Sequence, residues 1–507
     1  MNSGTTLLRM VAGVLISLVL TPFILFKVGI EAYGVYALVT ALVSYTSMLD
    51  LGIPTALSKY FAEYETTDQK EKMQKAVTTA FATFSFLSIV LAGLAWMLRS
   101  ILFDTFFPAV ENRGELTFLF FGCLFSFLLN IVTSVFPSIL QGLQRMDVTS
   151  FVSLVSDVVM AIFVLILLSM GSGIGGLVYA VVIGACVAAI LNLVFVKRLY
   201  PSFALRLRDI RVAELKKLLR FSLQMQSINV ASLVHTQFDK ILLGATLGVR
   251  YVAYYDIAGK IIKHIRNVPT SLIAPMLPAA SSLAAANEKE KLQKLYERSL
   301  KYMVGISLPL FLIAILLSYP FIKVWLGEGY ELSIYTLYFL LVANFINVFA
   351  GPAFWMLTGT GRIKYATVTA LSFAAVNIVL NIVLVRFFGY TGVVAGTSIS
   401  FILGALVLLV LYHRLDRIPL VSTVYKTLVI PLVGTIGAVV SFFVIRQLVS
   451  QLNMFSLIFT GGILALTYLA IVLGLGFLDA YDKTKMREFV SLFLSYKKTD
   501  ETGTKRA

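Results

Sequence analysis

The densest run of chemically capable side chains lies between residues 252 and 279, inside an otherwise apolar stretch. Asp256, Lys260, Lys263 and Asn267 recur at steps of three or four, so they share one face of a helix, and Arg266 flanks them. Charges inside a membrane span are expensive, so this face must meet water or other charges. Two interpretations stay open: a cationic wall that attracts an anion, or an Asp256–Lys260 pair that satisfies itself while the outer bases reach the interface.

A second polar face precedes it, between residues 221 and 243. Gln226, Asn229, Ser232, Thr236 and Asp239 again recur at steps of three or four. Such a face can line a water-filled cavity and offer hydrogen bonds to a polar ligand. We expect Asp239 to pair locally with its neighbour, Lys240.

Two further charges belong to the same question. Arg9 lies in the first apolar run and is either part of the cationic wall or merely interfacial. Asp50 precedes Gly52 and Pro54 and is expected to cap a broken helix.

Motifs for catalysis and for cofactors are missing from the sequence. His235, His264 and His413 are too scattered for a metal site, and no nucleophile motif or phosphate-binding loop is present. The segment GSGIGG at residues 171–176 joins two apolar helices and follows no strand, so it is read as a turn. We therefore expect no cofactor and no enzymatic activity.

The elements that must position these side chains are membrane helices. Of the 507 residues, 59% are hydrophobic and only 13% are charged, too few polar groups to cover a soluble surface. A spanning helix needs about 20 mostly apolar residues, and the sequence holds fourteen such runs, at about 5–26, 34–57, 77–98, 116–140, 148–169, 176–196, 221–243, 252–279, 303–322, 332–356, 365–385, 392–412, 427–446 and 455–477.

The basic residues predict the orientation. With the loops numbered in order, the even loops and the C-terminal tail hold 30 Lys and Arg, against seven in the odd loops. The positive-inside rule then places both termini in the cytoplasm. The formal net charge of +16 is spread over these short segments and forms no patch for nucleic acid.

The chain also repeats itself. DQKEKMQK at 68–75 matches NEKEKLQK at 287–294 in five of eight positions, at an offset of 219. Gly29 then aligns with Gly248. Further along the chain, Gly142 aligns with Gly359 at an offset of 217 and Gly176 with Gly392 at 216. Two six-helix units of like orientation follow, with a cavity between them near the midplane.

Four segments are therefore predicted. They are an N-lobe at 1–200, a basic cytoplasmic linker at 201–220, a C-lobe at 221–418, and two further helices with a cytoplasmic tail at 419–507. The fold class is an all-α integral membrane protein with 14 transmembrane helices, in two lobes related by a parallel pseudo-twofold repeat.

Several stretches resemble a known family. VGIEAYGVYALV and LDLGIPTALSKY in the first half, and DKILLG, LGVRYVAYYDIAGKI and QGLQR elsewhere, resemble bacterial polysaccharide transporters of the O-antigen flippase type. These belong to the multidrug/oligosaccharidyl-lipid/polysaccharide exporter superfamily. The resemblance covers essentially the whole chain, including the last two helices.

The resemblance implies a flippase of the bacterial inner membrane. Its cargo would be an undecaprenyl-diphosphate-linked oligosaccharide, and Lys260, Lys263 and Arg266, with Arg9 opposite, would hold the diphosphate or acidic sugars. Some members of the family couple to a proton or sodium gradient, and Asp256 and Asp239 would then be the candidates for binding H⁺ or Na⁺. Partners would be membrane lipids and a polymerase or ligase of the same pathway. A lipid II flippase, a multidrug antiporter, a membrane glycosyltransferase and a scaffold remain alternatives; the antiporter is disfavoured by the basic cavity and the glycosyltransferase by the short outer loops.

Overall fold

The computed structural model describes residues 2–67, 69–201, 203–273, 275–448, 453–485 and 488, and none of these lies in a β-strand. The helices are α1 (Asn2–Ser44), η1 (Tyr45–Asp50), α2 (Ile53–Thr66), α3 (Lys70–Phe106), α4 (Arg113–Thr133), α5 (Val135–Gly142), α6 (Met146–Ser169), α7 (Gly173–Leu199), η2 (Leu207–Asp209), α8 (Val212–Thr246), α9 (Val249–Ile273), α10 (Met276–Ala285), α11 (Lys289–Leu326), α12 (Glu331–Phe349), α13 (Gly351–Gly359), α14 (Ile363–Asp416), α15 (Leu420–Leu448) and α16 (Met454–Gly474).

Many of these helices are long and apolar enough to span a membrane. Within the described residues, eleven helical stretches are long and apolar enough to cross a bilayer. Two of them, α1 and α14, run on through kinks at Gly29 and Gly389, so each contains two of the predicted spans. α8 is not among the eleven, because its polar side chains lower its mean hydropathy. The chain is an all-helical, multi-pass membrane protein, as predicted.

Several predicted spans are broken near one end. The second one ends in η1, where the backbone N–H of Gly52 donates to Asp50 Oδ1 at 2.8 Å and Gly52 has φ +69°. Asp50 thus caps a break, as predicted. The spans at 116–140, 252–279 and 332–356 are each two helices in sequence, α4 with α5, α9 with α10, and α12 with α13.

The two halves of the chain repeat the same backbone turns. Gly29 and Gly248 both have positive φ, at 81° and 101°, and so do Gly173 and Gly389, at 56° and 57°. These pairs are separated by 219 and 216 residues, the offsets found in the sequence. A positive φ is costly for residues other than glycine, so the pairs mark turns that both halves require.

A close helix contact is repeated as well. A Cβ added at Gly142 would lie 2.9 Å from Phe61 and 3.0 Å from the carbonyl oxygen of Ser58. At Gly359 it would lie 2.7 Å from Ala280 and 3.0 Å from the carbonyl oxygen of Leu277. The contacted positions are themselves 219 residues apart, so α2 against α5 is packed in the same way as α10 against α13.

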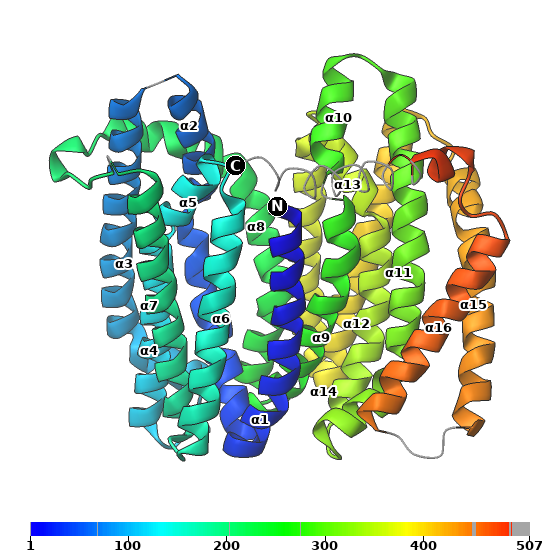
Figure 1. Cartoon of the computed structure of the whole chain (residues 1–507). Helices are drawn as coiled ribbons and strands as arrows, with labels where there is room; N and C mark the ends of the chain where they lie inside the picture. The colour runs from blue at the N-terminus through cyan, green and yellow to red at the C-terminus, as the bar shows by residue number, and fades with distance from the viewer. Residues whose placement is uncertain are drawn as a thin grey trace, which may run out of the picture.

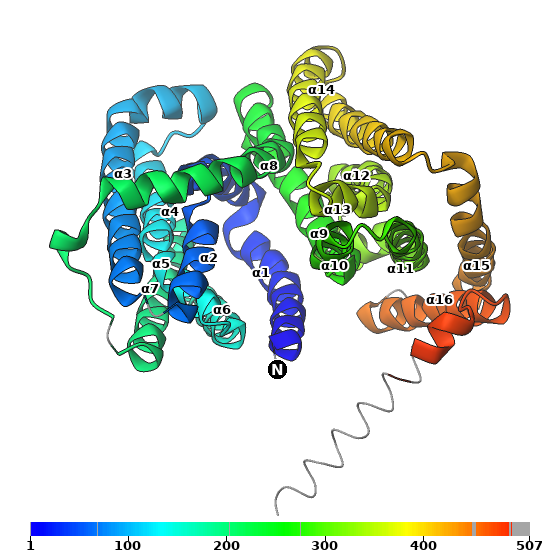
Figure 2. The ribbon, with the colours of Figure 1, turned by 90° about the horizontal axis from the view of Figure 1, so that it is seen from above.

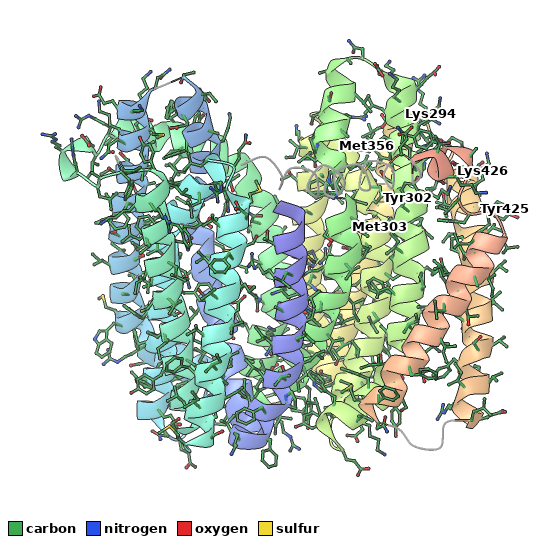
Figure 3. The ribbon with its side chains drawn as sticks, viewed as in Figure 1. Lys294, Tyr302, Met303, Met356, Tyr425 and Lys426 are labelled. Atoms are coloured by element: carbon green, nitrogen blue, oxygen red, sulfur yellow. The ribbon has the colours of Figure 1, made fainter. Side chains whose placement is uncertain are left out.

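The helices form two groups with α1 and α8 between them (Figure 1). α2 to α7 lie on one side, and α9 to α14 on the other, while α8 packs against α2 and α3 near its start and against α14 near its end. α2 ends and α3 begins at the same end of the molecule at which α10 ends and α11 begins (Figure 1). Lys294 and Lys426 also lie at this end (Figure 3). α8 starts at Val212, so the last residues of the predicted linker are helical.

The last two helices stand outside both groups. α15 and α16 pack against each other and against α11, at the edge of the molecule in Figure 2. The chain after α16 returns to α11: Lys301 Nζ lies 2.6 Å from Asp482 Oδ2, and the hydroxyl of Tyr302 donates to the same carboxylate. The predicted helices after residue 419 are thus anchored on the second half alone.

Candidate functional site

The main cavity lies within the second half of the chain. It has a volume of about 740 Å³ and is enclosed by α8, α9, α12, α13 and α14. Among the residues whose side chains the structure describes, none before Ala231 lines it, whereas the sequence predicted a chamber between the two halves. Seven of the predicted site residues line it: Ser232, Thr236, Asp256, Lys260, Lys263, Arg266 and Asn267.

Two residues of the polar face of α8 point elsewhere. Gln226 is buried, and its Nε2 donates to the carbonyl oxygen of Met48 at 3.0 Å. Asn229 Nδ2 lies 3.4 Å from Gln226 Oε1. The first part of this face therefore packs against η1 of the first half, because the start of α8 lies over that half.

Arg9 is exposed on α1 and is not among the residues that line the cavity. It acts electrostatically on Asp157 of α6, and so does Lys263 of α9. The Asp157 carboxylate of the first half thus interacts electrostatically with one cation from each half. This shared partner relates Arg9 to Lys263, although no direct contact joins them.

Arg266 and Lys263 have fewer partners among the described residues than Lys240 and Lys260, the other two cations that line the cavity. The Arg266 side chain is partly buried, and its one hydrogen bond runs from Nη2 to Asn347 Oδ1 at 3.1 Å. Neither Arg266 nor Lys263 forms an ion pair with any carboxylate of the described residues. A guanidinium held away from bulk water without a counter-charge is costly, so this part of the cavity favours an anion.

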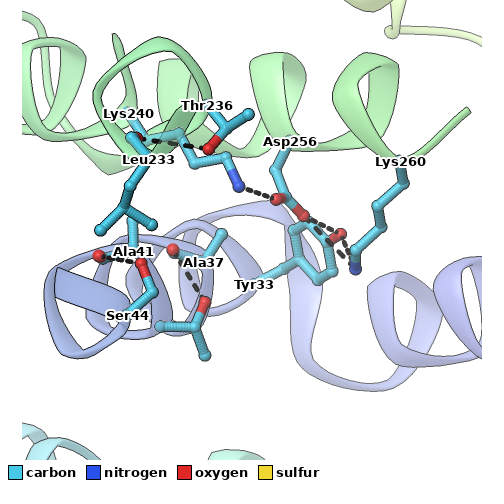
Figure 4. A network of polar contacts seen from close by, with 10 residues as sticks. Tyr33, Ala37, Ala41, Ser44, Leu233, Thr236, Lys240, Asp256 and Lys260 are labelled. Atoms are coloured by element: carbon cyan, nitrogen blue, oxygen red, sulfur yellow. Dashed lines mark hydrogen bonds and ion pairs between the residues drawn. The ribbon is translucent and has the colours of Figure 1, made fainter. Parts of the chain in front are cut away.

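Lys260, by contrast, is committed to a buried network with Asp256 (Figure 4). Its Nζ lies 3.3 Å from Asp256 Oδ2 and 2.6 Å from the hydroxyl of Tyr33, which itself donates to Asp256 Oδ2 at 2.6 Å. Lys240 Nζ reaches the other oxygen of Asp256, at 2.6 Å. The expected local pair of Lys240 with Asp239 is therefore wrong: Lys240 binds Asp256 of the next helix.

Asp239 sits in a second network, fully buried and without a cation in ion-pair range among the described residues. Asn381 Nδ2 donates to its Oδ1 at 2.6 Å, Thr397 Oγ1 donates to its Oδ2 at 2.9 Å, and the hydroxyl of Tyr255 donates to Oδ2 as well. Asn377 joins through Thr397, at 3.0 Å. The side-chain oxygens of Asn377 and Asn381 are buried and accept no hydrogen bond from any described group.

Sequence reasoning missed five members of these networks and assigned Lys240 to the wrong partner. Tyr33 and Tyr255 carry no pattern that separates them from ordinary interfacial residues. Asn377 and Asn381, four residues apart in an apolar run, are the signal that could have been used, since polar side chains in a span are functional suspects. Thr397 lies on the second arm of α14, and only the fold brings it to them.

The two halves are in close contact at the end of the molecule away from the start of α1. A Cβ at Gly34 would lie 2.0 Å from the carbonyl oxygen of Val249. Trp325 Nε1 donates to the carbonyl oxygen of Leu18 at 2.7 Å. In a helix that oxygen would accept from residue 22, but Pro22 has no N–H. The second half thus supplies the donor that the first half lacks, and this end is closed.

Many apolar helices around a charged cavity define a multi-pass membrane protein of the transporter class. A family model described as "Polysaccharide biosynthesis protein" matches residues 28–335, more than half of the chain. The chain belongs to this family, which confirms the resemblance read from the sequence.

Similar proteins agree with this assignment. A putative O-antigen transporter of Shigella flexneri is 25% identical over 434 residues, covering 82% of this chain and 97% of that protein. A probable flippase, AglR, of Haloferax volcanii is 22% identical over 395 residues, covering 76% and 78%. Among solved structures, the lipid II flippase MurJ in an inward closed conformation has a TM-score of 0.70 at 16% identity, covering 93% of this chain and 97% of that one. At that identity the likeness concerns the fold alone.

Proposed function

We propose that this protein is a flippase that moves a polyprenyl-diphosphate-linked oligosaccharide, of the O-antigen or capsule type, from the cytoplasmic to the outer leaflet of a bacterial inner membrane. The family membership and the relatives named as O-antigen transporter and flippase support this reading. The two halves would separate alternately at either end, and the prenyl tail would stay in lipid.

The observation that carries the proposal is the pair of cations without an ion-pair partner. Lys263 and Arg266 line a cavity among membrane helices, and no described carboxylate pairs with either. A diphosphate that crosses about 30 Å of hydrocarbon needs its charge neutralised, and a guanidinium can bind two phosphate oxygens at once. The cargo of an antiporter for cationic drugs would instead be repelled here.

The remaining predicted site residues would supply either positive charge or hydrogen bonds. Lys260 contributes positive charge while holding the contact with Tyr33, and Arg9 extends the cationic field into the first half. Ser232, Thr236 and Asn267 offer hydrogen bonds to sugar hydroxyls.

The topology belongs to the same proposal. Fourteen spans follow if the arms of α1 and of α14 each count as a span and α8 also crosses. Both termini would be cytoplasmic, and the two halves would be parallel repeats, in line with the shared turns and glycine contacts. The closed end then faces outward.

We further propose that Asp239, rather than Asp256, binds a coupling ion, H⁺ or Na⁺. Asp256 already has two lysines, whereas Asp239 has no cation partner among the described residues. The unpartnered oxygens of Asn377 and Asn381 lie in the same network as Asp239, and carboxylate and amide oxygens suit a hard cation. A polymerase or ligase would take the cargo on the outer side. A lipid II flippase is the second candidate, because its cargo carries the same diphosphate.

The test is reconstitution in proteoliposomes with a fluorescent polyprenyl-diphosphate sugar whose outer-leaflet fraction is quenched by dithionite. Lys263→Gln and Arg266→Gln should each slow flipping by about ten- to 150-fold, since a hydrogen bond to a charged group contributes roughly 1.5–3 kcal/mol. The double variant should be slower than either single variant. Lys426→Gln, an exposed lysine on α15, is the matched control and should flip at the wild-type rate. Unchanged flipping by the double variant would reject the cationic site, and equal rates with a lipid II analogue would favour the second candidate.

A further inference from the structure

Asp239 and Lys240, adjacent on α8, contact Tyr255 and Asp256, adjacent on α9. Asp239 receives the hydroxyl of Tyr255, and Lys240 binds Asp256 at 2.6 Å. Successive residues of a helix point about 100° apart. Each helix therefore directs one residue of its pair to the Asp239 network and the other to the Asp256 network, and any shift of one contact displaces the other.

The two networks end on different parts of the molecule. The Asp239 network is tied to α14 of the second half, through Asn381 and Thr397. The Asp256 network is tied to α1 of the first half, through Tyr33, whose side chain is fully buried. Figure 4 shows Tyr33 between Asp256 and Lys260, with Lys240 on the far side of the carboxylate. The second network is thus a bond between the halves.

The charges of the four side chains sum to zero. Asp239 and Asp256 carry two negative charges, and Lys240 and Lys260 carry two positive ones. Neutral tyrosines among the described residues also act on the two carboxylates: Tyr45 and Tyr255 on Asp239, and Tyr33 and Tyr36 on Asp256. Lys263 and Arg266 line the same cavity but stand outside this group of four. A cation added at Asp239 therefore leaves one uncompensated positive charge in the group.

We propose that Lys240 and Tyr255 are positioning residues that couple the charge state of Asp239 to the contact between Tyr33 and Asp256. Binding of a cation at Asp239 takes away the second anion near Lys240, and the buried group gains a net charge that is expensive away from water. Lys240 is 14% exposed and Lys260 already 34% exposed. Separation of the halves at this end lets water reach Lys240 and the covered part of Lys260 and removes the cost. The inference rests on the proposed binding of an ion by Asp239, and it assigns a role to that ion, which is to open the outer end.

The coupling must act in both directions. If the ion favours the open outer end, then opening that end raises the affinity for the ion by the same factor. The side facing outward would thus load the ion, and closure would follow its release.

The experiment measures the distance across the outer end with spin labels. Glu111→Cys between α3 and α4 and Arg386→Cys near the kink of α14 place one label on each half, both at exposed positions, in a chain with Cys123→Ala and Cys186→Ser. Pulsed electron–electron resonance on the full-length protein in nanodiscs is recorded with and without NaCl, and from pH 5 to pH 8. We expect the ion to raise the ratio of long to short distances by about five- to 150-fold, the usual range of such coupling.

The sign of the response is the decisive readout. Lys240→Met removes one positive charge, so the remaining charged side chains, Asp239, Asp256 and Lys260, carry a net charge of −1. Ion binding then brings this net charge to zero and should favour closure of the outer end. The ion response is thus expected to reverse in Lys240→Met and to be kept in Lys426→Met, the matched control. Asp239→Asn should hold the outer end open without any ion, and Tyr255→Phe should weaken the response while ion binding persists.

The outcomes separate the two proposals. If Asp239→Asn opens the outer end but neither Na⁺ nor pH changes the wild-type distances, the coupling of the networks stands and the proposed ion binding fails. If ²²Na⁺ or proton uptake requires Asp239 but the distances do not respond, or respond with the same sign in Lys240→Met, the coupling of the networks is wrong.

Discussion

Replacing Trp325 by Phe should weaken the closed outer end, because it leaves the carbonyl oxygen of Leu18 without a donor. That oxygen lacks its helical partner at Pro22, and the Trp325 indole supplies the missing hydrogen bond at 2.7 Å. A buried acceptor left unpaired costs about 1–3 kcal/mol. The phenyl ring keeps the stacking on Phe321, whose ring centre lies 5.3 Å away, so the change is confined largely to the hydrogen bond.

The matched background is Pro22→Ala, which restores an N–H at position 22. In that background the Leu18 oxygen can accept within its own helix, so Trp325→Phe should cost less than about 1 kcal/mol. The four proteins form a double-mutant cycle, and its interaction energy isolates this hydrogen bond.

The assay is the distance between labels at Glu111 and Arg386, converted to a ratio of open to closed populations. In the natural background Trp325→Phe should raise that ratio by about five- to 150-fold, because 1.4 kcal/mol corresponds to a factor of ten. An equal effect of Trp325→Phe in both backgrounds would refute the reasoning, since the cost would then not come from the Leu18 carbonyl.

Two further predictions concern stability. Gly142→Ala and Gly359→Ala should each lower the stability in detergent by about 1–3 kcal/mol, because the new Cβ atoms would lie 2.9 Å and 2.7 Å from their neighbours. Gly93→Ala is the control and should be neutral or stabilising, because nothing lies within 4 Å of a Cβ at that position. An equally large loss of stability in Gly93→Ala would contradict the packing argument. Burial raises the pKa of the Asp482 carboxyl, but hydrogen bonds from Lys301 and Tyr302 outweigh it and bring that pKa below its ordinary value. Asp482 therefore stabilises the fold fully above the unfolded-state pKa of about 4 and loses this contribution as the pH falls through the lower folded-state pKa. The difference in unfolding temperature between wild type and Asp482→Asn should be constant from pH 7 to about pH 5 and shrink towards pH 3; a difference that grows on acidification would show the opposite shift.

The sequence by itself determined the class of the protein. Long apolar runs can only be satisfied as helices in a bilayer, so their positions follow from composition. The repeat was readable too, because Gly29 with Gly248 and Gly142 with Gly359 answer local requirements of turn and packing that each half must meet separately. The face that carries Ser232, Thr236, Lys260, Lys263, Arg266 and Asn267 followed from helical periodicity, and all six side chains line one cavity.

Only the tertiary structure decided which charges neutralise one another. Periodicity places a side chain on a face of its own helix but says nothing of what stands opposite. Lys240 was therefore expected to pair with Asp239 but binds Asp256. Gln226 was expected to line the cavity but contacts η1, and Asn229 contacts Gln226. Asp239, Asn381 and Thr397 are separated by up to 158 residues, and they meet because the kink at Gly389 folds the two arms of α14 against α8.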